Sequence, residues 1–276
     1  MFCKVKDVDI YYEVIGQGKP VLMLHGFPLD HRMMKGALEP IFSKRKGWMR
    51  IYVDYPGMGK SSSADWIKGS DVFVEILLNF IDQIIGTKRF LIIGESFGGA
   101  MARAILYHRK SQIDGLFLFA PTIRTDGKHK NLPIRNIIEI DEEFMKTLPI
   151  VEKEFLESFA VKQNEYTWKR VKDETYSGYL SRNQSFIVYF EKGRALTYDI
   201  DDLQEPFDKP TLIITGRQDH WIGYRDAWDV QEKNYPCCTF AVLDVAGHGL
   251  QYEQVDIFNV MTHEWLDRVE SDLLRK

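Results

Sequence analysis

Short and nearly continuous runs of apolar residues recur along the chain, separated by longer stretches with helical spacing. Strands buried on both faces need such runs, because helices cover both sides of a parallel sheet. The runs that we interpret as strands are residues 8–15, 21–24, 49–53, 90–93, 116–119, 211–214 and 239–243. Residues 72–85 have helical spacing and are typical of a crossover helix. The alternation predicts an α/β fold with an open, twisted, mostly parallel sheet flanked by helices.

The alternation of strand and helix patterns stops between residues 122 and 206. This stretch has helical spacing, many aromatic residues and no strong pattern of a buried strand. We therefore expect a helical cap insertion of about four helices at 122–206. The α/β core domain would then consist of residues 1–121 together with residues 207–276.

Residues 94–98 read Gly-Glu-Ser-Phe-Gly and match the G-x-S-x-G pattern of a nucleophile elbow. The strand pattern at 90–93 precedes the motif and helical residues 100–106 follow it, which is the context that the motif requires. A sharp turn from strand to helix leaves room only for small neighbours of the serine. The hydroxyl then lies near a helix N-terminus, where N–H groups favour developing negative charge. Ser96 is therefore the predicted nucleophile.

A serine hydroxyl needs a general base, and the chain has seven histidines. His248 follows the last strand pattern, so it belongs to a loop at the carboxyl end of a strand, where ligands meet such a sheet. His220 is the rival candidate. The chain order of nucleophile, acid and base favours His248, and we interpret His220 as structural. His25, after an earlier strand pattern, is expected to make local hydrogen bonds in its loop.

The third member of the site must hold the second ring N–H of the histidine and stabilise the imidazolium. Asp219 follows the strand pattern at 211–214 after a short loop and is the predicted acid. Asp244 lies too close to His248 along the chain to reach round its ring easily. Asp199 belongs to an acidic run near the end of the insertion, which we interpret as exposed to solvent.

Two backbone amides are candidates for an oxyanion hole. In sites of this kind, the amide of the residue after the nucleophile works with an amide from the loop after an earlier strand. Here that loop has the sequence His-Gly-Phe-Pro at residues 25–28. We therefore predict that the N–H groups of Phe27 and Phe97 bind the oxyanion.

Together these motifs resemble those of the α/β-hydrolase superfamily, and the resemblance covers nearly the whole chain. The motifs that carry it are residues 25–28, 54–61 (Asp-Tyr-Pro-Gly-Met-Gly-Lys-Ser), 94–99, 216–219 and 247–248. Within the superfamily, the chain is similar to the cap-bearing serine esterases and carbon–carbon hydrolases. The resemblance implies an eight-stranded sheet, a helical cap over the site and no cofactor.

The motifs and the resemblance indicate a serine hydrolase that cleaves a small or medium ester, or a related acyl compound, through an acyl-enzyme. Carbon–carbon bond hydrolysis by the same fold is an alternative, although such enzymes usually flank the serine with asparagine and place a tryptophan soon after the histidine. Here Glu95 and Phe97 flank Ser96, and residues 249–250 after the histidine are Gly-Leu. Another alternative is a small-molecule sensor that keeps the triad and acts through a protein partner. The aromatic residues of the insertion either line an apolar pocket or pack the core of the insertion itself.

Composition narrows the class of protein further. The formal net charge of −4 argues against a nucleic-acid-binding protein, and no apolar run approaches the roughly 20 residues of a membrane span. The three cysteines fit no metal or disulfide pattern, and the N-terminus lacks the apolar core of a signal peptide. Both features favour a cytoplasmic protein. We expect a small-molecule substrate, no metal and no cofactor, and nothing indicates a protein partner or a homo-oligomer.

Overall fold

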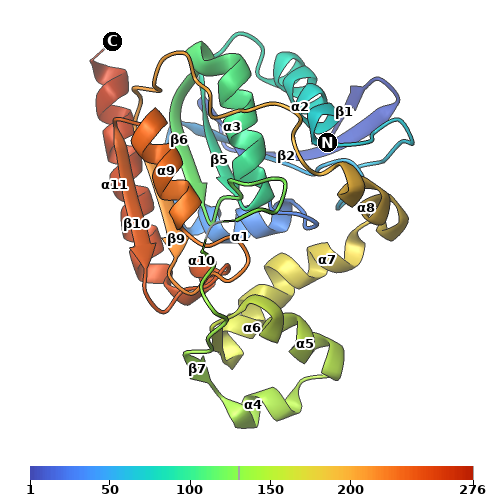
Figure 1. The fold of residues 1–276 in the computed structure, drawn as a ribbon. Coiled ribbons are helices and arrows are strands. Elements are labelled where there is room, and N and C mark those ends of the chain that lie inside the picture. Colours follow the sequence, from blue (N-terminus) through green and yellow to red (C-terminus); the bar gives the residue numbers. More distant parts are fainter. Residues whose placement is uncertain (130, 276) are drawn as a thin grey trace.

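A computed structural model describes residues 1–129 and 131–275 of the chain. Its main sheet has eight strands in the order β1-β2-β4-β3-β5-β6-β9-β10, drawn as arrows in Figure 1. The strands are β1 (Phe2–Val5), β2 (Val8–Ile15), β3 (Lys19–Leu24), β4 (Trp48–Val53), β5 (Phe90–Glu95), β6 (Ile113–Phe119), β9 (Thr211–Gly216) and β10 (Cys238–Leu243). β2 pairs antiparallel with both β1 and β4, and the other pairs are parallel. The predicted α/β fold with a mostly parallel sheet is confirmed.

Helices cover both faces of this sheet, which explains the continuous apolar runs. Successive side chains of a strand point to opposite faces. In β3, Val21 and Met23 accordingly join the buried cluster that contains α1 and α11 residues, whereas Leu22 and Leu24 join the cluster under α2 and α3. No helix within residues 1–129 and 131–275 is long and apolar enough to cross a membrane. The helices that pack around the sheet are α1 (His31–Phe42), α2 (Ser70–Ile84), α3 (Phe97–Arg109), α9 (Arg225–Asn234), α10 (Leu250–Glu253) and α11 (Val255–Leu274).

The interval from residue 122 to 206 contains mainly short helices. These are α4 (Glu142–Thr147), α5 (Ile150–Phe159), α6 (Glu165–Val171), α7 (Ser177–Ser181) and α8 (Gln184–Phe190), with a π-helical stretch (Lys172–Tyr176) joining α6 to α7. Two strands of two residues each, β7 (Glu139–Ile140) and β8 (Lys162–Gln163), pair with one another in a separate sheet. In the described part of this interval, no strand joins the main sheet.

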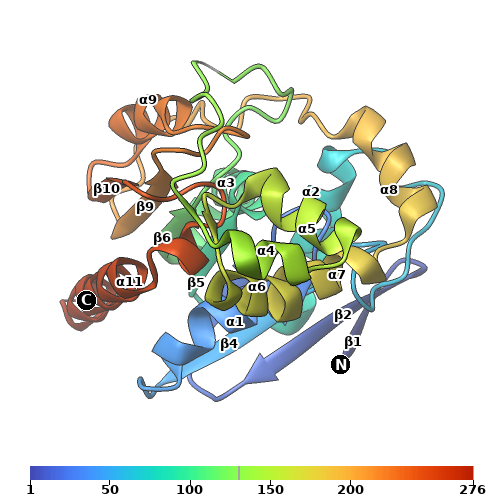
Figure 2. The same ribbon diagram turned by 90° about the horizontal axis from the view of Figure 1, so that it is seen from below.

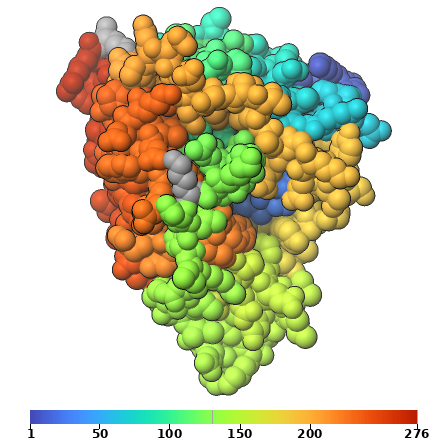
Figure 3. Space-filling model, in the orientation of Figure 1, coloured from blue at the N-terminus to red at the C-terminus, as the bar shows by residue number. Residues whose placement is uncertain are grey.

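The helices α4 to α7 form a lobe at one end of the molecule. They lie below the main sheet in Figure 1 and in front of it in Figure 2, and Figure 3 shows the lobe at the bottom of the surface. Leu156 and Trp168 belong to its own apolar core, together with Tyr252 of α10. α8 packs elsewhere, because Phe190 stacks on Phe73 of α2 with ring centroids 4.2 Å apart. The division of the chain at residues 121 and 207 stays a prediction.

Asparagine and aspartate residues start several of the short helices in this interval. The side chains of Asp141, Asn164 and Asn183 each accept the backbone N–H three residues further on, at 2.9 to 3.2 Å. An N-cap of this kind contributes about 1 kcal/mol, which matters because helices this short are marginal on length alone. The local sequence therefore sets where these helices begin.

Candidate active site

Loops that follow several parallel strands meet where the main sheet faces the lobe formed by α4 to α7. The cavity between them is lined by residues 26–29 after β3, by the end of β5, and by the loops after β9 and β10. On the other side it is lined by residues of α5 and of the π-helical stretch. Ligands bind at this edge of open α/β sheets, because the carboxyl ends of the strands lie there.

Ser96 lies at the turn between β5 and α3, as its motif predicts. Its backbone has φ 50° and ψ −119°, and α3 begins at the next residue, Phe97. A Cβ at Gly94 would collide with the carbonyl of Gly98, and a Cβ at Gly98 would collide with the carbonyl of Leu24. The glycines of the motif are therefore required by the close approach of backbone segments around the serine.

The structure brings Ser96, His248 and Asp219 together in one hydrogen-bond chain. The Ser96 Oγ atom lies 3.0 Å from Nε2 of His248, and Nδ1 of His248 lies 2.8 Å from Oδ2 of Asp219. The other carboxylate oxygen of Asp219 accepts the N–H groups of Trp221 and Ile222 at 3.0 and 3.2 Å. Asp219 is also fully buried. Because contacts at both oxygens fix its carboxylate, Asp219 holds the imidazole in one orientation.

The rival residues lie outside this chain of contacts. Asp244 is exposed and accepts a hydrogen bond from the Gln218 side chain at 2.7 Å. Asp199 is also exposed, and its carboxylate accepts the backbone N–H of Asp201. His220 is half-buried and lines a neighbouring cavity, and among the described residues it has no hydrogen bond to the serine.

The two amides predicted to bind an oxyanion come from the loop after β3 and from the start of α3. Phe27 and Phe97 line the same cavity as Ser96, and their rings meet edge to face at 5.8 Å. Phe97 is the first residue of α3, so its N–H points out of the helix N-terminus. His25 makes the expected loop contacts: Nδ1 lies 2.8 Å from the Gly26 carbonyl and Nε2 accepts the N–H of Tyr55.

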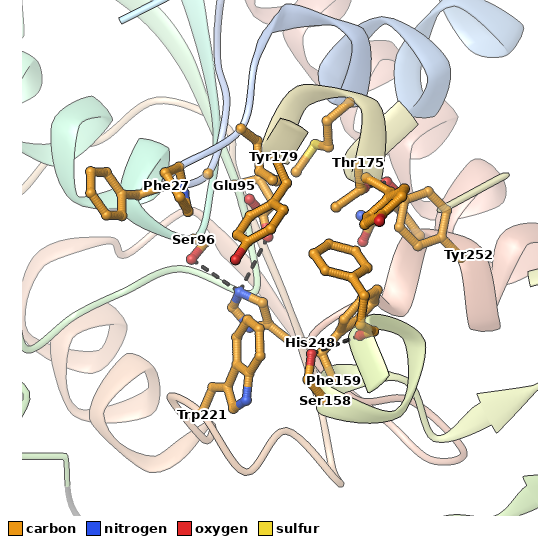
Figure 4. Close-up of a pocket in the computed structure, with 18 of the residues that line it drawn as sticks. Phe27, Glu95, Ser96, Ser158, Phe159, Thr175, Tyr179, Trp221, His248 and Tyr252 are labelled. Carbon is orange, nitrogen blue, oxygen red and sulfur yellow. Dashed lines mark hydrogen bonds and ion pairs between the residues drawn. The ribbon is translucent and has the colours of Figure 1, made fainter. Parts of the chain in front are cut away.

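An apolar cavity of about 360 Å³ opens beside Ser96 (Figure 4). Its walls combine core residues with side chains from the interval 122–206. Aromatic rings dominate them, and the cavity has no lysine or arginine among its lining residues. The aromatic residues that line it are Phe27, Phe155, Phe159, Tyr176, Tyr179, Trp221 and Tyr252. Several of these also belong to the core of the lobe, so the two roles predicted for the aromatic residues are shared by the same side chains.

A second cavity, of about 420 Å³, also has Ser96 and His248 in its lining. Its lining is more polar and includes Thr122, His129, Arg194 and His220. The guanidinium of Arg194 lies 5.7 Å from the centre of the Phe27 ring. Within residues 1–129 and 131–275, Arg194 forms no ion pair with a carboxylate. The walls of the two cavities thus differ in their chemistry.

Glu95 is a residue of the site whose role no sequence pattern predicted. Its side chain is 3% exposed, and its Oε1 lies 3.4 Å from Nε2 of His248. Figure 4 shows Glu95 and Ser96 both facing the same nitrogen of the ring. The other oxygen, Oε2, lies against Gly26 and has no hydrogen-bond partner among the described residues. Burial raises the pKa of Glu95 to about 8, against the opposing charge of His248. The negative charge of Asp219 raises it further, and the backbone N–H of Gly26 lowers it slightly, although its geometry falls short of a hydrogen bond to Oε2. The only sequence signal was an acidic residue inside the elbow motif.

Carboxylates on both sides of the ring determine the protonation of His248. Burial by itself lowers the pKa of His248, but Asp219, through its charge and hydrogen bond, acts in the opposite direction. Glu95 and Glu253 add to this effect, and the net result is a raised pKa. The unprotonated ring that a general base requires is therefore favoured only as the pH rises into the alkaline range.

One group of buried side chains has the spacing of a metal site. Within residues 1–129 and 131–275, ligand atoms of Asp30, His31 and Asp54 lie within 4.8 Å of one another. Asp54 already accepts the N–H of His31 at 2.8 Å, and Asp30 forms an ion pair with Arg32. Nε2 of His31 lies 3.2 Å from Glu13. Because each member has a protein partner, we interpret the group as a polar network that links β2, β4 and α1.

Comparison with known proteins places this geometry in context. A family model described as alpha/beta hydrolase fold matches residues 19–255. The AB hydrolase superfamily protein YisY of Bacillus subtilis is 26% identical over 271 residues, which cover 92% of this chain and 94% of that protein. A pimeloyl-acyl-carrier-protein methyl ester esterase of Legionella pneumophila is 22% identical over 265 residues, covering 94% of this chain and 100% of the relative. The crystal structure of an alpha/beta superfamily hydrolase from Oenococcus oeni has a TM-score of 0.85 and 30% identity, over 95% of this chain and 96% of that one. The resemblance that the motifs indicate is confirmed.

Proposed function

We propose that this chain, which belongs to the alpha/beta hydrolase family, hydrolyses esters or related acyl compounds with Ser96 as its nucleophile. The observation that carries the proposal is the contact chain from Ser96 through His248 to Asp219, with separations of 3.0 and 2.8 Å. It links a hydroxyl to a base and the base to a buried carboxylate, which is what acyl transfer to serine requires.

In the first step, the Ser96 oxygen forms a bond to the carbonyl carbon while its proton moves to Nε2 of His248. The carbonyl electrons move to the oxygen, which accepts hydrogen bonds from the N–H groups of Phe27 and Phe97. In comparable sites each such donor contributes about 3 kcal/mol. Asp219 holds the imidazolium through Nδ1. The carbon–oxygen bond to the alcohol then breaks, and the alcohol takes the proton from His248.

Water completes the reaction in the second step. His248 removes a proton from the water molecule as its oxygen attacks the carbonyl of the acylated Ser96. When this intermediate collapses, the proton passes from His248 to the serine oxygen, and the carboxylic acid leaves. The same ring therefore acts as base and then as acid in both halves of the cycle.

The apolar cavity supports a substrate with a small or medium apolar group. Its volume of about 360 Å³ and its aromatic lining suit a short aliphatic or aromatic acyl chain. We propose that residues 122–206 act as the cap of the site, because Phe155 and Tyr179 from this interval line the cavity. The name of the Legionella pneumophila relative, a methyl ester esterase, supports ester hydrolysis as the reaction.

Turnover of a series of 4-nitrophenyl esters from acetate to decanoate tests the proposal. Ser96→Ala should leave the circular dichroism spectrum unchanged and remove nearly all hydrolysis, and a fluorophosphonate should label Ser96 in the wild-type protein only. His248→Ala should also abolish turnover, whereas the matched His220→Ala should keep most of it. A Ser96→Ala protein with substantial residual turnover would contradict the assignment of the nucleophile.

The same experiment separates the two alternative functions. A burst of one equivalent followed by little turnover on every ester would favour a small-molecule sensor that retains the triad. Labelling of Ser96 without ester turnover, together with cleavage of a vinylogous diketone, would favour carbon–carbon bond hydrolysis. Fast multiple turnover of esters favours the proposed function.

A further inference from the structure

A second carboxyl group faces the proton-accepting nitrogen of His248. Nε2 lies 3.0 Å from the Ser96 hydroxyl and 3.4 Å from Oε1 of Glu95. The shorter contact is a hydrogen bond, and the longer one is within the range of an ion pair. Ser96 therefore keeps the direct hydrogen bond to the ring, while Glu95 acts on the same nitrogen mainly through its charge.

The surroundings of Glu95 leave His248 as its principal partner, with a smaller contribution from the backbone N–H of Gly26. The cavity that Glu95 lines has no lysine or arginine in its wall. The charge of Glu95 raises the pKa of Tyr55, which is fully buried. Asp219 lies on the other side of the His248 ring, at Nδ1. Glu253 is held by the backbone N–H of Gly247 at 2.6 Å and acts on the ring from its own side. A buried carboxyl needs a positive partner to be ionised, and the imidazolium is the group in position to supply it.

We propose that Glu95 is a positioning residue that holds the protonated form of His248 from the Nε2 side, opposite Asp219 on the Nδ1 side. The proposal rests on the function proposed above, because it concerns the imidazolium formed when Ser96 gives up its proton. The ring is then held between two carboxyl groups at the moment when it carries the charge. Glu95 directly precedes Ser96, so the same turn between β5 and α3 places both side chains.

The carboxyl group of Glu95 affects His248 both in the transition state and in the resting enzyme. Glu95 stabilises the imidazolium in the transition state of each half-reaction, but it does so in the resting enzyme too. Because the pKa values of Glu95 and His248 are both raised, protons must leave this pair before the ring can act as a base. A role in packing alone would not alter the protonation of the ring, since glutamine has nearly the same shape as glutamate.

The first measurement is the titration of His248 by NMR in protein labelled at histidine, without substrate. Glu95→Gln should lower the pKa of His248 by about one pH unit or more, because it removes a negative charge within 4 Å of the ring. Glu95→Asp, which shortens the side chain and withdraws the carboxylate, should give an intermediate value. The matched control is Glu154→Gln. Glu154 lines the same cavity but is exposed, so its loss should leave the titration of His248 unchanged.

The second measurement is the pH profile of kcat/KM on one ester. If Glu95 raises the pKa of His248, the acid limb of the Glu95→Gln profile should move to lower pH by the same interval as the NMR titration. The plateau at high pH should fall, because the imidazolium in the transition state has lost a partner.

Unchanged titration of His248 in both Glu95 variants would overturn the proposal. Should Glu95→Gln fail to fold, Glu95→Asp alone decides the question by the same titration. The NMR result does not need turnover, so it distinguishes the two proposals. A shifted titration in a protein without ester hydrolysis would contradict the proposed function and leave the contact between Glu95 and His248 intact. Normal hydrolysis with an unshifted titration would contradict only the role of Glu95.

Discussion

At the residue scale, Ser96 and His248 are fixed by different means. Ser96 has a positive φ of 50°, and the glycines around it allow neighbouring backbone segments to come close. Its hydroxyl is therefore positioned by the turn itself. His248 lies in a loop, and its ring is oriented by the contact with Asp219 at 2.8 Å. The loss of the carboxylate should thus affect the proposed base, His248, and leave the proposed nucleophile, Ser96, in place.

We expect Asp219→Asn to reduce kcat by about 10⁴-fold, as the same change does in comparable triads. The amide cannot stabilise the imidazolium, and it favours the wrong tautomer of the ring. The measurement is kcat on one ester, with folding checked by circular dichroism. Asp244→Asn is the matched control, because Asp244 is exposed and belongs to the loop that leads to His248. Near-normal turnover of Asp219→Asn, together with loss of activity in Asp244→Asn, would contradict the assignment.

The position of a residue along the chain decided whether its role in the site could be predicted from the sequence. Ser96, Asp219 and His248 each follow a strand pattern, so parallel topology alone brings them to the same edge of the sheet. Glu95 could not be assigned a role in this way, because the orientation of its side chain depends on the loop that contains Gly26. Arg194 lies far from any strand pattern, and nothing in its local sequence indicates that it lines a cavity beside the serine.

At the element scale, a buried arginine joins both ends of the interval 122–206 to the helix that follows Ser96. Arg103 of α3 is fully buried, and it donates to the carbonyl of Thr122 and to the carboxylate of Asp201 at 2.9 Å each. The N–H of Thr122 donates in turn to the carbonyl of Ser96 at 2.9 Å. The chain therefore leaves the core and returns to it at points that are tied to the elbow.

We expect Asp201→Ala to lower the free energy of unfolding by about 3 kcal/mol or more, because it leaves the charge of Arg103 buried without its partner. The measurement is unfolding in urea followed by circular dichroism. The matched control is Asp202→Ala, since Asp202 is exposed and lies 3.5 Å from Lys233. An exposed pair of this kind contributes less than about 1 kcal/mol. Equal destabilisation by the two variants would contradict the role of Arg103.

The elements themselves were only partly predictable from sequence. Seven strands of the main sheet coincide with the apolar runs, but β1 does not have one, because only alternate residues of it, Cys3 and Val5, are buried. The helical spacing of 122–206 indicated helices, and it did not distinguish α8 from the others. α8 packs on α2 through the contact between Phe190 and Phe73, which depends on the path of the chain and not on local pattern.

At the scale of the whole molecule, Ser96 belongs to the lining of two cavities of different character. The apolar cavity contains Glu95 and Glu154 and no basic lining residue apart from His248. The other cavity contains Arg194 and His220 and no acidic lining residue. If the proposed ester substrate extends from Ser96 into both cavities, we expect an apolar group in the first and a polar or anionic group in the second. The distribution of charge therefore predicts which ester of a matched pair the enzyme prefers.

We expect Arg194→Gln to reduce kcat/KM selectively for esters that carry a carboxylate. Arg194 is half-buried and has no carboxylate partner among the described residues, so a substrate anion would provide its ion pair. Two matched pairs test this: monoethyl adipate against ethyl hexanoate, with the charge on the acyl side, and butyrylglycolate against ethyl butyrate, with the charge on the alcohol side. A hydrogen bond to a charged group contributes about 1.5–3 kcal/mol, so the loss should be about tenfold or more in the pair whose charge reaches the guanidinium. The kcat/KM values for the neutral esters should change little.

Lys192→Gln is the control, because Lys192 is exposed two residues away and does not line the cavity. If Arg194→Gln affects charged and neutral esters alike in both pairs, the polar cavity does not select an anionic group.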